Sequence, residues 1–108
     1  MPMEHENCPC METCPLNRAM ALIGGKWKMQ ILCALSNNGP TRYNRLKKTL
    51  DRVSNTVLAN ALRELEEDGL VLRREYLEVP VRVEYEITAP GRALVPILDR
   101  LGDWSMGL

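Results

Sequence analysis

The sequence lacks two features that would point directly to a partner or a compartment. It carries no net charge, because 14 Lys and Arg residues balance 14 Asp and Glu residues. Total charge therefore does not indicate nucleic-acid binding, which has to be judged from the distribution of charge. No stretch approaches the roughly 20 apolar residues that span a bilayer, and the acidic start MPMEHENCPC does not resemble a signal peptide. We expect a cytoplasmic protein that does not contact a membrane.

Catalytic machinery is also missing from the sequence. There is one histidine, His5, and we find neither a nucleophile next to a base nor a phosphate-binding loop. The sequence therefore predicts a protein that is not an enzyme and that uses no cofactor.

What is present is the composition of a small globular protein. Of 108 residues, 45% are apolar and 26% are charged, which suits one domain with its own core. We expect that domain to span residues 14–108. Residues 1–13, which contain Cys8 and Cys10, are expected to form a flexible segment in front of it.

Apolar spacing and capping residues predict the elements of this domain. Cys14-Pro15 begins a helix that ends at Gly24-Gly25, since proline is tolerated where the first N–H has no partner. A helix from Lys26 to Leu35 is apolar on nearly every side, which is typical of a central helix. A short helix follows from about Tyr43 to Leu50.

The second half of the chain changes from helical to strand periodicity. Ser54 is a good N-cap and Gly69 a good terminator for an amphipathic helix between them. Its expected buried stripe is Val57, Leu58, Ala61, Leu62 and Leu65. Leu70–Leu77 and Val81–Thr88 then form a β-hairpin around the turn Glu78-Val79-Pro80, and Thr88 caps a last helix.

This order predicts an α+β, mainly helical fold, namely a winged helix-turn-helix with a two-stranded β wing and flanking terminal helices. Several stretches closely resemble HxlR-type regulators, a winged-helix family allied to MarR. They are CPLNRAMALIGGKWKMQILCAL, GPTRYNRLKKTL, VSNTVLANALRELEEDGLVLRREY and EVPVRVEYEITAPGRALVPIL.

The resemblance implies a homodimeric repressor or activator that binds double-stranded operator DNA. It also implies that the first and last helices form the dimer interface and that the Ser54 helix enters the major groove. Two positions depart from the family pattern, because Asn55 stands where Gln is frequent and Thr56 where Lys is frequent. The operator sequence therefore cannot be carried over.

Candidate DNA contacts gather around the predicted helix-turn-helix. A basic strip, in which only Asp51 is acidic, consists of Arg42, Arg45, Lys47, Lys48 and Arg52. Candidate contacts on the Ser54 helix are Ser54, Asn55, Thr56, Asn60 and Arg63. Arg82 in the wing is a candidate for minor-groove or phosphate contact. Each has a plainer alternative: a solvated helix face for the strip, pairing of Arg63 with Glu67, and pairing of Arg82 with Glu78.

An apolar stripe on the terminal helices predicts the dimer interface. Its residues are Leu16, Met20, Leu94, Ile97, Leu98, Leu101 and Trp104. These are more apolar residues than a small core needs, so an isologous dimer would cover them. The alternative is that the last helix closes the core of the monomer.

Three clustered cysteines suggest thiol chemistry. Cys14 lies at a helix N-terminus near Arg18, where a thiolate is stabilised, and Cys8 and Cys10 are near enough in sequence to resolve an oxidised thiol. In some HxlR-type regulators a cysteine at this Cys-Pro position is a redox switch, which implies an oxidant or electrophile as effector. The alternative is a Cys14 that merely caps the helix and packs. His5, Cys8, Cys10 and Cys14 could together supply four metal ligands. Their spacing is not that of a zinc site, so we predict no metal. Cys33 is expected in the core.

One rival function remains. A winged helix that contacts only other proteins would fit the zero net charge but not the basic strip.

Overall fold

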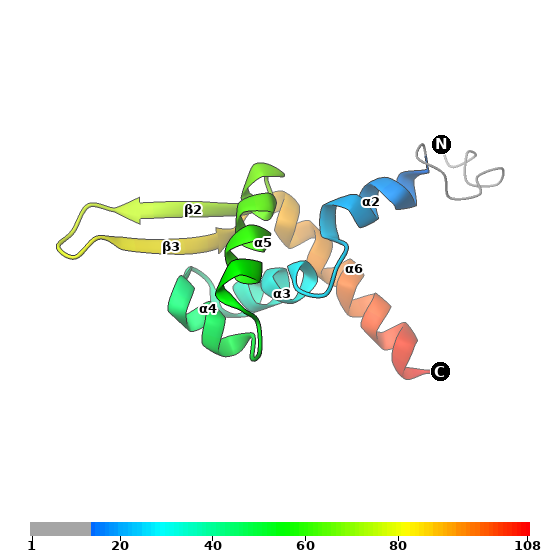
Figure 1. Ribbon diagram of the computed structural model, residues 1–108. Coiled ribbons are helices and arrows are strands. Elements are labelled where there is room, and N and C mark those ends of the chain that lie inside the picture. Colours follow the sequence, from blue (N-terminus) through cyan, green and yellow to red (C-terminus); the bar gives the residue numbers. More distant parts are fainter. Residues whose placement is uncertain (1–13) are drawn as a thin grey trace.

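The computed structural model describes residues 14–108, and Figure 1 shows the arrangement of its elements. In chain order they are α2 (Pro15–Ile23), α3 (Lys28–Asn38), β1 (Thr41–Arg42), α4 (Tyr43–Thr49), α5 (Asn55–Glu67), β2 (Val71–Tyr76), β3 (Arg82–Ile87) and α6 (Ala89–Met106). The predicted winged helix-turn-helix, α+β and mainly helical, is confirmed.

The core lies where α3 crosses behind α5, in agreement with the prediction that the second helix is central. Ile31, Leu32 and Leu35 of α3 are fully buried, and so are Leu58 and Leu65 of α5. Burying a large aliphatic side chain contributes roughly 1.5–3 kcal/mol, so these contacts hold α5 to the body.

Two residues expected in the interior lie elsewhere. Val57 is 42% exposed, because it stands at the edge of the α5 stripe and lines a shallow hollow beside the loop that contains Gly24 and Trp27. Cys33 is only half-buried and faces α6 instead of the core. The remaining members of the predicted α5 stripe are buried.

The sheet has three strands, namely the two strands of the predicted wing and β1, which the sequence did not predict. Its order is β1-β3-β2, and all pairs are antiparallel. β1 has two residues, with Thr41 opposite Tyr85 and Arg42 opposite Glu84. A strand of two residues shows no alternation, so the sequence pattern could not reveal it. β1 ties the start of α4 to the base of the wing formed by β2 and β3.

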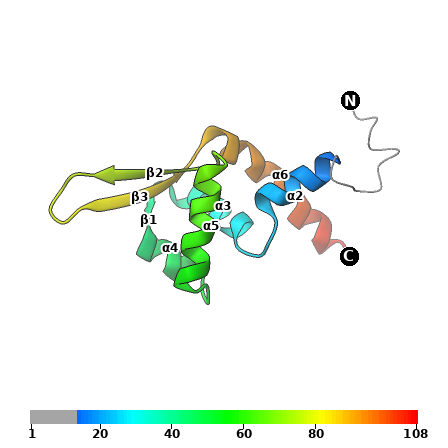
Figure 2. The same cartoon turned by 45° about the horizontal axis from the view of Figure 1, so that its top comes forward.

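The last helix consists of two parts that pack differently. Near its start Gly91 is buried, and Leu94 and Val95 pack against the core. Pro96 lies inside the helix, where it removes one backbone donor. Beyond Pro96 no residue of α6 is buried. In Figures 1 and 2 this part of α6 and α2 occupy the end of the molecule opposite the wing. Within residues 14–108, no helix is long and apolar enough to cross a membrane.

Candidate nucleic-acid interface

The helix-turn-helix is formed by α4, α5 and the turn between them. The Ser54 hydroxyl accepts a hydrogen bond from the backbone N–H of Val57 at 3.1 Å, which confirms the predicted N-cap of α5. The Tyr43 hydroxyl of α4 lies 3.1 Å from both the backbone oxygen and Oδ1 of Asn55. This link fixes the start of α5 against α4. It also means that the Asn55 side chain already has a partner inside the protein.

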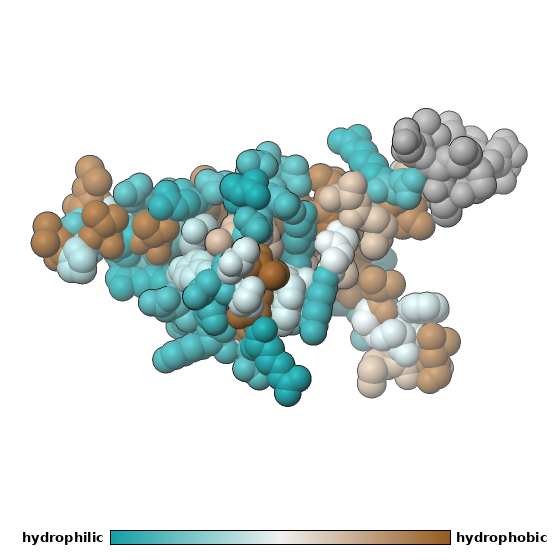
Figure 3. Space-filling model, in the orientation of Figure 1, coloured by the Kyte–Doolittle hydropathy of each residue, from teal (hydrophilic) through white to brown (hydrophobic). Residues whose placement is uncertain are grey.

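The basic strip lies on α4 and the segments on either side of it. Arg42, Arg45, Lys48 and Arg52 are exposed, and Lys47 is half-buried. Among residues 14–108, no carboxylate forms an ion pair with any of these five side chains. The strip is therefore a local positive surface on a neutral protein, and Figure 3 shows that the middle of the molecule is strongly hydrophilic.

A groove runs between the strip and the outer part of the wing. Its volume is about 670 Å³, and its lining includes Arg42, Arg45 and Lys48 on one side and Val81 and Arg82 on the other. Three of the strip's cations thus face a common concave surface. Such a surface suits the backbone of a nucleic acid, because Arg and Lys side chains neutralise successive phosphates.

The outward face of α5 carries the polar residues that the sequence indicated. Thr56 and Asn60 are exposed. Arg63 lies 3.4 Å from Glu67 Oε2 and 3.4 Å from Asn60 Oδ1, so the pairing considered as an alternative for Arg63 is present. These long contacts between exposed groups are weak. They orient Arg63 along the helix without burying it.

Arg82 is held much more firmly than Arg63. It donates to Glu78 at 2.8 Å and to Glu84 at 2.7 Å, and it stacks on the Tyr76 ring at 3.9 Å. Hydrogen bonds to Glu78 and then Glu84 raise the pKa of Arg82, and the hydrogen bond from Arg82 lowers the pKa of Glu78. The Glu78 pairing considered from the sequence is present, and Glu84 is a second partner. Arg82 organises the wing internally.

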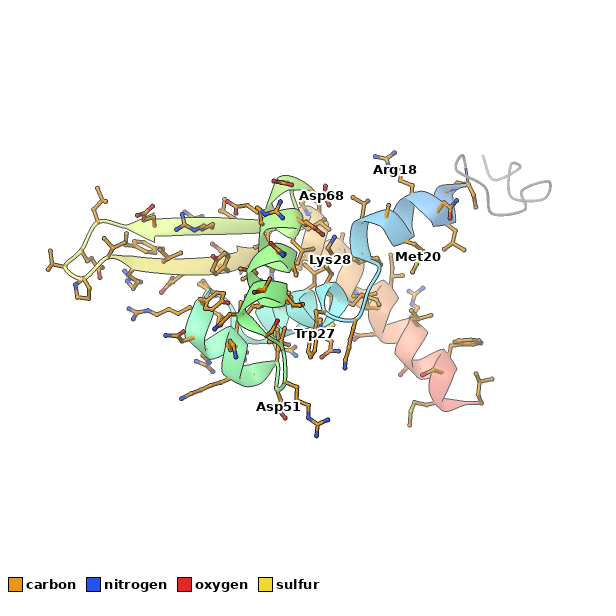
Figure 4. All side chains as sticks on the ribbon, in the orientation of Figure 1. Arg18, Met20, Trp27, Lys28, Asp51 and Asp68 are labelled. Atoms are coloured by element: carbon orange, nitrogen blue, oxygen red, sulfur yellow. The ribbon has the colours of Figure 1, made fainter. Side chains whose placement is uncertain are left out.

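An ion pair that sequence reasoning missed sets the position of α5. Lys28 Nζ at the start of α3 lies 2.7 Å from Glu64 Oε1 on α5, and the Lys28 side chain is only 13% exposed. Figure 4 shows Lys28 between the two helices. The hydrogen bond from Lys28 lowers the pKa of Glu64. Because the residues are 36 positions apart, no local pattern could have paired them.

The proposed dimer residues differ in exposure. Leu16 and Met20 of α2 are about half exposed, and α2 has no buried residue at all. On α6, Ile97, Leu101 and Trp104 are 59%, 52% and 64% exposed. Leu94 instead packs on the core, as the alternative interpretation of the stripe expected. Leu98 and Trp104 also line an apolar groove of about 680 Å³ between α3 and α6.

The cysteines lie in three environments. Cys14 occupies the N-cap position of α2 and is 1% exposed. Cys33 lines the α3–α6 groove, and its pKa is raised by burial and then by Asp99. His5, Cys8 and Cys10 lie outside the described residues. Within the described residues, no three acidic, His or Cys side chains are grouped so that they could hold a metal ion.

The fold and the basic groove define a winged helix-turn-helix protein of the nucleic-acid-binding type. A family model, described as an HxlR-like helix-turn-helix, matches residues 22–108. The chain belongs to this family and is a helix-turn-helix transcriptional regulator, as the sequence predicted, and not an enzyme.

Individual relatives agree with this assignment. The uncharacterized HTH-type transcriptional regulator BH0655 of Halalkalibacterium halodurans is 42% identical over 92 residues, which are 85% of this chain and 81% of the relative. The redox regulator HypR in its oxidized form has a TM-score of 0.80 and 36% identity, covering 88% of this chain and 97% of HypR. The reduced form of the transcriptional regulator YodB from Bacillus subtilis has a TM-score of 0.77 and 33% identity, covering 85% and 90% of the two chains.

Proposed function

We propose that this regulator binds an inverted-repeat operator in double-stranded DNA as a homodimer. The observation that carries the proposal is the basic strip, whose cations are unpaired within residues 14–108, whereas Arg63 and Arg82 have carboxylate partners. In this arrangement the phosphate backbone lies in the groove of Arg42, Arg45 and Lys48, and α5 presents Thr56 and Asn60 to base edges. Two helix-turn-helix units related by a two-fold axis require half-sites that lie about one helical turn of DNA apart, or a multiple of it.

The proposal is tested by recovering bound fragments from genomic DNA with the purified, reduced protein. We expect enrichment of inverted repeats. Lys48→Ala should weaken binding to all sequences and reduce the slope of log K against log salt concentration by about 1. Asn60→Ala should mainly relax sequence preference. If no fragment is enriched, the proposal fails and a winged helix that serves protein contacts is favoured instead.

We further propose that Cys14 is a thiol sensor that changes DNA affinity. The thiol lies at the N-terminus of α2, at the positive end of the helix dipole. Because α2 carries part of the proposed dimer surface, a shift of α2 alters the spacing of the two recognition helices. The name of HypR describes that relative as a redox regulator, which supports the same role here. Cys14 is almost fully buried, so an oxidant or electrophile reaches it only when the structure around it opens.

The thiol proposal is tested by operator affinity before and after treatment with diamide or a quinone. We expect the native protein to change its affinity and Cys14→Ser to remain unchanged. Cys33→Ser serves as the control and should respond like the native protein. Equal responses of the native protein and Cys14→Ser would remove Cys14 from the mechanism and leave DNA binding itself unaffected.

A further inference from the structure

The tip of the wing, residues 77–81, is unusually apolar for an exposed turn. Leu77 is 91% exposed, Val79 101% and Val81 54%. Figure 3 shows these hydrophobic side chains gathered at the end of the molecule that carries the wing, beyond the hydrophilic middle. They contribute nothing to the core, which ends at Val71 and Ile87. Apolar side chains that gather on an exposed surface mark a contact with a partner.

The wing tip presents no unpaired charge. Its one acidic residue, Glu78, accepts hydrogen bonds from Arg82 at 2.8 and 3.3 Å. Arg82 is in turn shared with Glu84 and stacked on Tyr76. A wing that reads the minor groove with an arginine would have to break all of these contacts. The wing tip therefore offers apolar surface to a partner, while the guanidinium of Arg82 stays hydrogen-bonded within the hairpin.

The position of the wing tip identifies the partner as DNA. Val81, Arg82 and Val83 line the same groove as Arg42, Arg45 and Lys48. A duplex whose phosphates occupy that groove continues toward the end of the hairpin. The wing also points away from α2 and the end of α6, so a second copy bound at those helices leaves the wing tip uncovered (Figures 1 and 2).

We propose that the wing tip is an apolar wedge that presses Leu77 and Val79 against the sugars and base steps of the adjoining minor groove and bends the duplex. Apolar side chains that enter the minor groove partly unstack a base step and kink DNA toward the major groove. Pyrimidine–purine steps deform most easily, so the wedge prefers such a step beside each half-site. This inference rests on the proposed DNA binding.

The test compares the native protein with Leu77→Ser/Val79→Ser on an enriched fragment trimmed to about four helical turns, ~40 base pairs. Binding is titrated at several salt concentrations, and the bend is measured by energy transfer between dyes at the two DNA ends. Both side chains are exposed, so the double variant should fold normally. We expect about tenfold weaker binding, because apolar contact area is lost. The salt slope should not change, because no phosphate contact is removed. The end-to-end distance should return toward that of free DNA.

Two controls separate this inference from the proposed function. Leu108→Ser removes an apolar side chain that is 89% exposed at the other end of the molecule and should bind and bend like the native protein. Lys48→Ala should weaken binding and lower the salt slope. If Lys48→Ala behaves so while the wing-tip variant binds and bends DNA normally, the wedge is wrong and DNA binding stands. If the native protein binds no duplex, both fail. If the wing-tip variant changes only the sedimentation of the protein, the wing tip contacts a second copy and the wedge is overturned.

Discussion

At the scale of single residues, the turn of the helix-turn-helix contains a backbone conformation that its side chain disfavours. Arg52 has φ 75°, the only positive value at a non-glycine position within residues 14–108. A left-handed conformation costs an L-residue roughly 1–2 kcal/mol, whereas glycine adopts it freely. The position of Arg52 in the basic strip offers a reason to keep arginine there, because its charge adds to the surface beside α4.

We expect Arg52→Gly and Arg52→Ala to separate these two effects. Both variants lose the same charge and should weaken DNA binding equally. Arg52→Gly removes the backbone strain but gives the unfolded chain more freedom, so its free energy of unfolding should exceed that of Arg52→Ala by up to ~1 kcal/mol. Urea denaturation and a salt titration of DNA binding measure the two quantities. A lower stability for the glycine variant would contradict the strain argument.

The Lys28–Glu64 pair predicts a pH dependence of stability. The hydrogen bond from Lys28 depresses the pKa of Glu64 in the folded state. The contribution of the pair is therefore complete above the unfolded pKa of glutamate, about 4.3, and disappears as pH falls through the lower, folded value. We expect the native protein to be more stable than Glu64→Gln at neutral pH, and the difference should shrink below about pH 4. Denaturation curves across pH measure it. The control repeats this comparison without the lysine, in the variants Lys28→Gln and Lys28→Gln/Glu64→Gln. Their difference in free energy of unfolding should not depend on pH in this range.

At the scale of elements, the junction of α5, β2 and α6 holds the wing at a definite angle to the helix-turn-helix. The Thr88 hydroxyl donates to the Gly69 oxygen at 2.7 Å and accepts from the Gly91 N–H at 3.2 Å. Gly69 has φ 79°, which allows the chain to reverse after α5. Gly91 packs so closely that a Cβ atom there would lie 2.5 Å from the Leu70 oxygen and 2.8 Å from Ile87 Cγ1.

Two alanine substitutions within α6 should therefore have opposite effects. Gly91→Ala forces the helix away from the sheet and should lower the free energy of unfolding by about 1–3 kcal/mol. Gly102→Ala places a methyl group in open space and should raise it by about 0.5–1 kcal/mol, since alanine favours the helix. Thermal and urea unfolding decide between these signs. Equal effects of the two variants would mean that the junction accommodates a methyl group at position 91 without cost.

At the scale of the whole molecule, the two ends present different surfaces. The wing and the basic groove lie at one end and in the middle, while α2 and the second part of α6 lie at the other end and carry their own exposed apolar residues (Figures 1 and 3). Pro96 marks the boundary on α6, because Leu94 and Val95 before it pack on the core, whereas no residue after it is buried. A dimer formed at the α2–α6 end would leave the helix-turn-helix of each subunit free to contact DNA.

We expect Leu98→Asp/Leu101→Asp to yield a monomer, because two buried and unpaired carboxylates in each subunit oppose association. Sedimentation equilibrium at micromolar concentration measures the mass. Leu77→Asp carries a charge at the wing end instead and should remain dimeric. A native monomer would refute the dimer, and a dimer unaffected by the α6 charges would place the interface elsewhere. Loss of the dimer should also abolish preference for inverted repeats over single half-sites.

The sequence by itself determined the order and type of every element except β1. Caps such as Ser54 and Thr88, the reversal at Gly69 and the change of period after it are local signals, because each acts over a few neighbouring residues. The family resemblance added the class of regulator. The basic strip could also be read from sequence, since its residues are neighbours along the chain.

Only the tertiary structure decided which side chains are exposed and which are paired with another residue. It paired Lys28 with Glu64, placed Arg82 between Glu78 and Glu84, exposed Val57, and added β1 to the sheet. It also divided the stripe of α6 into a part that packs on the core and a part that does not. The physical reason is the same in each case. Periodicity states which face of an element a residue occupies, whereas burial and pairing depend on what other elements bring to that face.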